Sequence, residues 1–276
     1  MTTTRVTGPL HTRSVGTAGP HVAFLHGLFG QGRNWNQIAK GVSGARHDDA
    51  QCLLVDLPDH GRSPRTPQFS YEGYADSVAA TLGDTAPAET WALVGHSLGG
   101  KVAMLVALLH PDLVERLVVV DIAPKSYGSL DRFAGYIDEM RRLPLRELTS
   151  RADAEERFHE SDPGVKAFLL QNLRRDGDSW RWQANLDLFA ADAARGSASR
   201  IAGWPAVADK VAPFAGPVLW IAGGASPYIR AEDTEGMRRL FPAVELLTVE
   251  GATHWVHTEA PAVVIDALRR FVGADA

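Results

Sequence analysis

The segment Gly95-His96-Ser97-Leu98-Gly99 places a serine between two glycines in the pattern Gly-x-Ser-x-Gly. It follows an apolar run, residues 91–96, and opens an apolar stretch with helical spacing. A strand-turn-helix this tight leaves no room for a Cβ at either glycine, and it lifts the serine clear of the backbone. A serine presented in this way can attack a carbonyl carbon once a neighbouring base takes its proton. Ser97 is therefore the candidate nucleophile.

Attack on a carbonyl also requires two backbone N–H groups that face the developing negative charge. We expect one at Leu98, the residue after the nucleophile. The second is expected in the glycine-rich turn of residues 26–30, at Leu28, with Phe29 as the alternative. His26 is expected to hold that turn through hydrogen bonds.

The elements that must position these groups follow from hydrophobic periodicity. Six runs are apolar almost without alternation: residues 21–26, 51–57, 91–96, 116–123, 217–223 and 244–250. Such runs are typical of parallel strands covered by helices on both faces. Helical spacing appears between them, at Val102, Leu105, Val106 and Leu109, and again from Pro261 to Phe271. This alternation predicts an α/β fold with a doubly wound, mostly parallel sheet.

The alternation stops between residues 121 and 217, where the pattern becomes helical. A helix is indicated by the common face of Phe133, Tyr136, Ile137 and Met140, a second by a capping box at Ser150, and a third from Asp162-Pro163 to about Arg175. We predict a core of residues 1–123 and 205–276 and a helical cap of residues 124–204. Residues 1–20 indicate only a possible edge hairpin.

Composition limits the class of protein. A length of 276 residues allows one core domain with an insertion, and a net charge of -5 without long single-sign runs argues against a nucleic-acid partner. The single cysteine, Cys52, lies in an apolar run and excludes an intrachain disulfide. The first residues lack the apolar core of a signal peptide, and the most apolar helical segment, residues 102–109, is too short to span a bilayer. We expect a cytoplasmic protein without metal or cofactor; oligomeric state is left open.

Several motifs together resemble the α/β-hydrolase superfamily over nearly the whole chain: HGLFG (26–30), DLPDHGRSP (56–64), GHSLGG (95–100) and GATHW (251–255). Within it, HGLFGQGRNW, GHSLGGKVAM, LVVVDIAP and HWVHTEAP resemble small cytosolic acyl esterases and thioesterases. The superfamily more often has Gly or Asn where Asp59 stands, so no role is transferred to Asp59, and its loop is expected to be structural.

The resemblance implies the chain order serine, acid, histidine, so the base should follow the last strand. His254 lies in the first loop beyond that strand, and His257 one turn later is the alternative. His60 and His96 are expected to be structural.

The acid is less obvious, because the loop after residues 217–223 holds no carboxylate in Gly223-Gly224-Ala225-Ser226-Pro227. The resembling esterases take it from the preceding strand, and LVVVDIAP matches their motif at Asp121. In this fold the two strands are neighbours, so Asp121 can reach the histidine, with Ser226 expected to hydrogen-bond the carboxylate. Glu232 and Asp233 are the alternatives.

A helical lid over the serine predicts an apolar acyl pocket. Its expected lining includes Phe29, Tyr127, Ser226 and Trp255, whereas most aromatic residues of the cap are expected to pack within it. Lys101, one helical turn after Ser97, is expected to be ion-paired or solvated.

The sequence thus predicts a serine hydrolase of carboxylic esters or thioesters, with short to medium acyl groups and the triad Ser97, His254 and Asp121. Its partner is a small-molecule substrate. Carbon–carbon bond hydrolysis, perhydrolysis or acyl transfer by the same triad remains open, as does a ligand-binding receptor on this scaffold.

Overall fold

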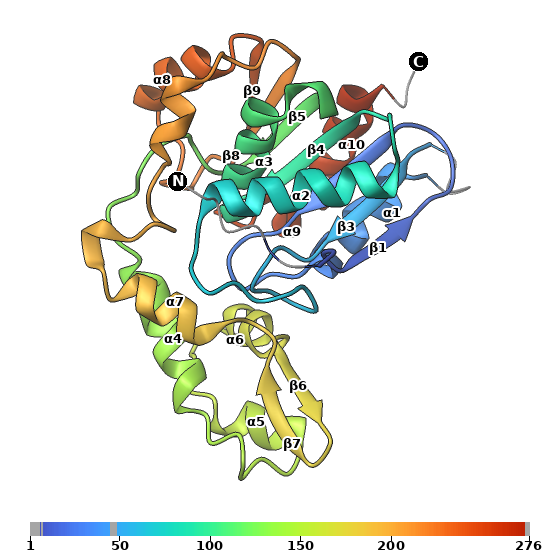
Figure 1. The fold of residues 1–276 in the computed structure, drawn as a ribbon. Helices are drawn as coiled ribbons and strands as arrows, with labels where there is room; N and C mark the ends of the chain where they lie inside the picture. The colour runs from blue at the N-terminus through green and yellow to red at the C-terminus, as the bar shows by residue number, and fades with distance from the viewer. Residues whose placement is uncertain (1–5, 7, 45–48, 274–276) are drawn as a thin grey trace.

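The core is a seven-stranded sheet in the order β1-β3-β2-β4-β5-β8-β9 (Figure 1). A computed structural model describes residues 6, 8–44 and 49–273. The strands are β1 (Thr12–Val15), β2 (His21–Leu25), β3 (Gln51–Val55), β4 (Trp91–His96), β5 (Val114–Val120), β8 (Val218–Gly223) and β9 (Val244–Val249). All neighbouring pairs are parallel except β1 with β3. The carboxyl ends of the six parallel strands therefore share one edge of the sheet.

Helices cover both faces, as the apolar strand runs predict. Alternate strand residues point to opposite sides and enter two hydrophobic clusters. One cluster includes α2 (Tyr71–Thr85), α3 (Leu98–Leu109) and α8 (Thr234–Leu240); the other includes α1 (Asn36–Val42) and α10 (Pro261–Val272). The doubly wound α/β fold is thereby confirmed.

The cap elements come between β5 and β8 and form a separate layer beside the core (Figure 1). They are α4 (Asp131–Arg142), α5 (Arg151–Arg157), α6 (Pro163–Leu170), the antiparallel pair β6 (Leu173–Asp176) and β7 (Ser179–Trp182), and α7 (Leu186–Ala193). The expectation of an all-helical cap with a helix reaching Arg175 was wrong. Asp176 pairs with Ser179 across a two-residue turn, in which Gly177 has a φ of 61°. The turn residues are Gly177 and Asp178, and a glycine at the first position of a two-residue turn is a usual sequence signal for such a hairpin.

Two strand expectations also need correction. β9 lies at the sheet edge, so it is not buried on both faces, and Leu246 is 52% exposed. At the other edge, β1 is a single strand paired with β3, where the sequence had indicated a possible hairpin. Part of that range, residues 1–5 and 7, lies outside the described residues.

Candidate active site

Ser97 stands in the turn between β4 and α3, with backbone angles φ 52° and ψ -118°. A Cβ at Gly95 would lie 2.3 Å from the Gly99 carbonyl oxygen, and one at Gly99 would lie 2.4 Å from the Leu25 carbonyl oxygen. Both distances are far below van der Waals contact. The glycines are therefore required because the first turn of α3 presses against β4 and β2.

Strained backbone is concentrated at this edge of the sheet. Among the described residues, five non-glycine residues have a positive φ, and four of them follow successive strands: Phe29 after β2, Asp59 after β3, Ser97 after β4 and Asp121 after β5. Such conformations persist only where the surroundings hold them, and they are common at functional sites. This carboxyl edge is thus where the fold stores strain.

Asp121 and His254 meet at the same edge. Nδ1 of His254 lies 2.7 Å from Oδ2 of Asp121, whose side chain is fully buried. The Asp121 carboxylate also accepts hydrogen bonds from the Gly223 N–H, at 2.9 Å, and from the Ser226 hydroxyl. The expected Ser226 contact is therefore present. Three donors compensate the burial of a charge that would otherwise be costly.

The two alternative acids lie elsewhere. Asp233 forms an ion pair with Lys125, with Nζ 2.7 Å from Oδ1, and Glu232 lies near the Arg230 guanidinium. The structure therefore brings Asp121 to His254 and engages the other two carboxylates with surface cations.

Further rings fix the position of His254. Tyr228 stacks on its imidazole with ring centroids 4.0 Å apart, and Nε2 of His96 hydrogen-bonds to the His254 carbonyl oxygen at 2.8 Å. His257 is buried and stacks on Trp35 at 4.5 Å. Burial lowers the pKa of His96 well below 6.5 and the pKa of His257 to about 3. Both rings are therefore neutral packing groups at neutral pH.

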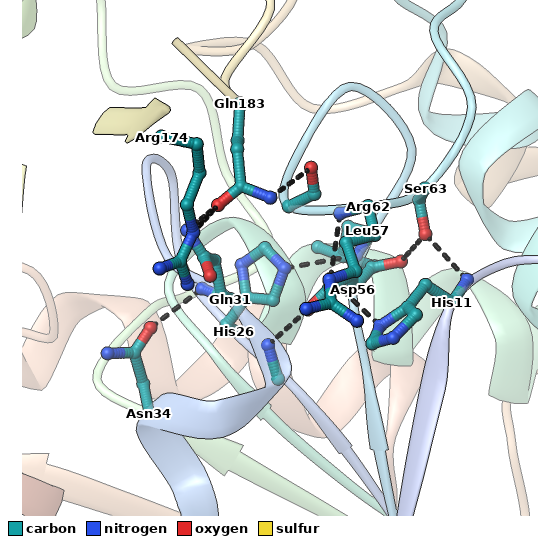
Figure 2. A network of polar contacts seen from close by, with 12 residues as sticks. His11, His26, Gln31, Asn34, Asp56, Leu57, Arg62, Ser63, Arg174 and Gln183 are labelled. Atoms are coloured by element: carbon teal, nitrogen blue, oxygen red, sulfur yellow. Dashed lines mark hydrogen bonds and ion pairs between the residues drawn. The ribbon is translucent and has the colours of Figure 1, made fainter. Parts of the chain in front are cut away.

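Polar contacts with the loop that follows β3 hold the turn of residues 26–30 in place (Figure 2). Nε2 of His26 accepts the Leu57 N–H at 3.0 Å, while its Nδ1 faces the Gly27 carbonyl oxygen at 2.8 Å. The Asp56 carboxylate accepts the N–H groups of Gly32 and Arg62, at 2.7 and 2.9 Å. The loop after β3 thus fixes the loop after β2, in the structural role expected for His26.

Asp59 has a structural role that the sequence did not specify. Its buried carboxylate accepts hydrogen bonds from the Thr66 backbone and hydroxyl, from the Tyr74 hydroxyl and from Nδ2 of Asn185. Asn185 immediately precedes α7, so the carboxylate ties the cap to the core. Gln31 makes a second tie through Nε2 to Oδ1 of Asn172, at 3.1 Å. Sequence reasoning missed both cap residues, because single polar residues in a helical region carry no local signal for their partners.

Ser97 lines two cavities in the described part of the chain. A very small one, which we call the junction, is also lined by Leu28, His254, Tyr228 and Trp255. A larger one of about 340 Å³, which we call the Lys101 cavity, is lined by Leu28, Leu98, Lys101, Tyr127 and apolar cap residues. Two expected pocket residues, Tyr127 and Trp255, thus line a cavity beside Ser97.

Phe29 and Lys101 differ from expectation. Phe29 is fully buried and packs on Phe133 and Phe189, so it supports the pocket wall and is not among the residues that line either cavity beside Ser97. Lys101 is neither solvated nor ion-paired: it is 2% exposed, and Nζ donates to the carbonyl oxygens of Ala202 and Gly203 at 3.1 and 2.6 Å. Burial lowers its pKa to about 7. It thereby links the nucleophile helix to the returning end of the cap.

Within residues 6, 8–44 and 49–273, no group of three or more His, Cys, Asp or Glu side chains is arranged to hold a metal ion. Over the same part of the chain, no helix has the length and apolar character to cross a bilayer.

Comparison with known proteins agrees with this fold. A family model described as the alpha/beta hydrolase fold matches residues 20–261. The chain is 36% identical to the sn-1-specific diacylglycerol lipase ABHD11 of Mus musculus over 92% of this chain and 81% of that protein. It is 31% identical to esterase YbfF of Escherichia coli strain K12, over 91% of this chain and 92% of that protein. A solved marine microorganism esterase superposes with a TM-score of 0.85 at 30% identity, covering 95% and 99% of the two chains. The chain therefore belongs to the alpha/beta hydrolase family.

Proposed function

We propose that this chain hydrolyses carboxylic esters through an acyl-enzyme formed on Ser97. That it is an ester-hydrolysing enzyme follows from its family and from relatives named as esterase and lipase. The residues, the order of steps and the substrate range are the proposal. The observation that carries it is the 2.7 Å contact between His254 and Asp121, beside a junction that Ser97 and His254 line together.

In the first half-reaction, Ser97 Oγ attacks the carbonyl carbon while Nε2 of His254 takes the hydroxyl proton. The N–H groups of Leu28 and Leu98 are proposed to stabilise the oxyanion. His254 then gives its proton to the leaving oxygen, and the acyl group stays on Ser97.

In the second half-reaction, His254 takes a proton from water as the water oxygen attacks the acyl carbon, and the imidazolium then returns that proton to Ser97 Oγ as the acid leaves. Asp121 accepts the Nδ1–H of His254 throughout, which keeps the Nε2 lone pair directed at the proton it must take. The buried carboxylate also stabilises the imidazolium in each half-reaction.

The Lys101 cavity supports a short to medium acyl group. Its volume of about 340 Å³ lies near the lower end of the range for ligand pockets, roughly 300 to 1,000 Å³. Turnover of p-nitrophenyl esters should therefore peak at short to medium chains and fall for long ones. A cytoplasmic location also remains a proposal, supported by the buried free thiol of Cys52.

The test is covalent trapping. A p-nitrophenyl phosphonate should label Ser97 with release of one equivalent of p-nitrophenol, and Ser97→Ala should neither be labelled nor turn over p-nitrophenyl butyrate above background. Labelling of another residue, or turnover by Ser97→Ala within tenfold of the unmodified enzyme, would refute the mechanism.

A further inference from the structure

A third cavity adjoins the junction through a different set of lining residues from the Lys101 cavity. It has a volume of about 420 Å³, and we call it the Trp255 cavity. It shares Gly27, His96 and Trp255 with the junction, whereas the Lys101 cavity shares Leu28, Ser97, Phe133 and Tyr228 with it. The reacting serine and histidine are therefore flanked by two separate spaces, as a substrate with two parts requires.

The proposed chemistry decides which part enters which space. The acyl carbon becomes bonded to Ser97, and Ser97 lines the Lys101 cavity together with the first turn of α3. The leaving oxygen must receive its proton from His254. The Trp255 cavity is lined by Trp255 and His257, which follow His254 along the chain. The acyl group thus extends toward Lys101, and the leaving group toward Trp255.

Charge differs sharply between the two spaces. Lys101 and Arg230 line the first, and none of its described lining residues is an aspartate or glutamate. Asp162 and Glu259 line the second, together with Asn34, Gln37 and Gln171, whose side-chain amides are neutral. Within the part of the chain that the structure describes, no lysine or arginine lines this second cavity.

The histidines of the Trp255 cavity do not compensate its carboxylates. His26, His96 and His257 are buried, and burial lowers the pKa of each below 6.5. An anionic leaving group would therefore face two carboxylates among the lining residues, which opposes its binding. The Arg33 guanidinium lies behind this lining and donates to the Gln171 carbonyl oxygen, at 2.9 Å. An uncharged group with hydroxyls would instead meet amide donors and acceptors and the edge-to-face pair of Phe168 and Trp255, with ring centroids 4.6 Å apart.

We propose that the Trp255 cavity is the leaving-group subsite, and that it takes an uncharged, hydroxyl-bearing alcohol in preference to a phosphate-bearing thiol. The inference rests on the proposed ester hydrolysis at Ser97 and specifies its substrate: a neutral ester rather than a coenzyme-A-type thioester.

A pair of thioesters tests the charge preference with the reacting bond unchanged. S-butyryl-N-acetylcysteamine has a neutral leaving thiol, and butyryl-coenzyme A has one with several phosphate charges. We expect kcat/KM at low ionic strength to be at least tenfold higher for the neutral thioester. Asp162→Asn combined with Glu259→Gln should raise kcat/KM for butyryl-coenzyme A severalfold, a gain that misfolding cannot imitate. Equal or faster hydrolysis of butyryl-coenzyme A by the unmodified enzyme would overturn the preference.

Two variants that each fill one cavity with a tryptophan test where the leaving group binds. Val165, on α6, lines the Trp255 cavity, and Val165→Trp should lower kcat/KM for glyceryl butyrate at least tenfold while methyl butyrate changes less than threefold. The rate at which a preformed butyryl-enzyme hydrolyses should stay unchanged, because the leaving group has already departed. The matched control is Ser129→Trp, in the Lys101 cavity, which should discriminate by acyl length and not by alcohol.

The outcomes separate this inference from the proposed function. If Val165→Trp slows methyl and glyceryl esters equally, or slows acyl-enzyme hydrolysis, the subsite assignment is wrong although ester hydrolysis at Ser97 stands. If the unmodified enzyme forms no butyryl-enzyme on Ser97 from any of these substrates, the proposed function itself fails.

Discussion

Replacing Asp121 by asparagine tests the proposed acid with almost no change in shape. In the structure three donors converge on the two carboxylate oxygens: the Gly223 N–H, the Ser226 hydroxyl and His254 Nδ1. Asparagine supplies one oxygen and one NH₂ group. With its oxygen toward Gly223, the NH₂ group faces His254 and can donate only to an unprotonated Nδ1. The imidazole proton then moves to Nε2, where the lone pair is needed to take the Ser97 proton.

The wrong tautomer removes the base in most molecules, so we expect kcat to fall about 10⁴-fold, as in other serine triads. This corresponds to about 5.4 kcal/mol, since each tenfold change is about 1.36 kcal/mol. The assay is the pre-steady-state burst of p-nitrophenol from p-nitrophenyl butyrate, which measures acylation directly. A thermal unfolding curve for each variant separates lost chemistry from lost folding.

Glu232→Gln and Asp233→Asn are the controls, because those carboxylates were the alternative acids and lie against Arg230 and Lys125. Both should keep kcat near that of the unmodified enzyme. The reasoning fails if Asp121→Asn stays within tenfold of normal, or if either control loses more activity than Asp121→Asn.

Four other outcomes follow from the contacts. Ser226→Ala removes one donor from the Asp121 carboxylate, so we expect roughly a tenfold loss of kcat, from about 1.5 kcal/mol for a hydrogen bond to a charged group; an unchanged kcat would deny the contact any effect. Gly223→Ala places a Cβ 2.3 Å from the Thr253 carbonyl oxygen and should lower kcat at least tenfold by displacing the His254 loop, whereas Gly236→Ala, in open space, should leave kcat unchanged. Lys101→Met leaves two carbonyl oxygens without their donor and should destabilise the cap by about 1 to 3 kcal/mol, seen as faster cleavage between residues 124 and 204 in limited proteolysis. Burial lowers the pKa of His257 from 6.5 to about 3, so the folded protein binds this proton less readily than the unfolded chain. The stability contributed by the neutral ring is therefore complete above pH 6.5 and is lost as the pH falls toward 3. His257→Phe should reduce the difference between the free energies of unfolding in urea at pH 7.5 and pH 5 by up to about 2 kcal/mol.

The elements that position the site were predictable because their signals are local. Six strands are visible in the sequence as apolar runs, five of them in the interior of the sheet and β9 at its edge. Gly95 and Gly99 mark a turn whose crowding the structure shows in backbone distances. The contact between Asp121 and His254 was predictable only through the fold, because parallel strands bring loops that are distant in sequence to one edge of the sheet. What the sequence could supply was therefore the order of elements and the edge at which they meet.

Most of the incorrect expectations have one physical cause: the structure at these positions depends on partners that lie far away in sequence. β9 has an apolar run but ends the sheet, and no local pattern tells an edge strand from a central one. In the sequence Lys101 resembles a surface lysine, but in the fold the end of the cap covers it and the Ala202 carbonyl oxygen accepts a hydrogen bond from its Nζ. Phe29 follows a glycine turn as a pocket residue would, yet its side chain points into the contact with Phe189. The cap hairpin is the exception, since its turn signal, Gly177-Asp178, is local.

The end of β8 shows why the acid does not occupy position 223, which is a glycine. A Cβ there would meet the Thr253 carbonyl oxygen at 2.3 Å, and the next residues bind the same loop, with the Ala225 N–H 2.9 Å from the Ala252 carbonyl oxygen. The loop that carries His254 thus lies directly on the backbone of the β8 loop. With no side chain in the way, the Gly223 N–H is free to donate to Asp121 from the adjacent strand. A carboxylate at Gly223 would displace the loop that carries the histidine it was meant to orient, so the close approach of these loops favours an acid supplied by Asp121, directly after β5.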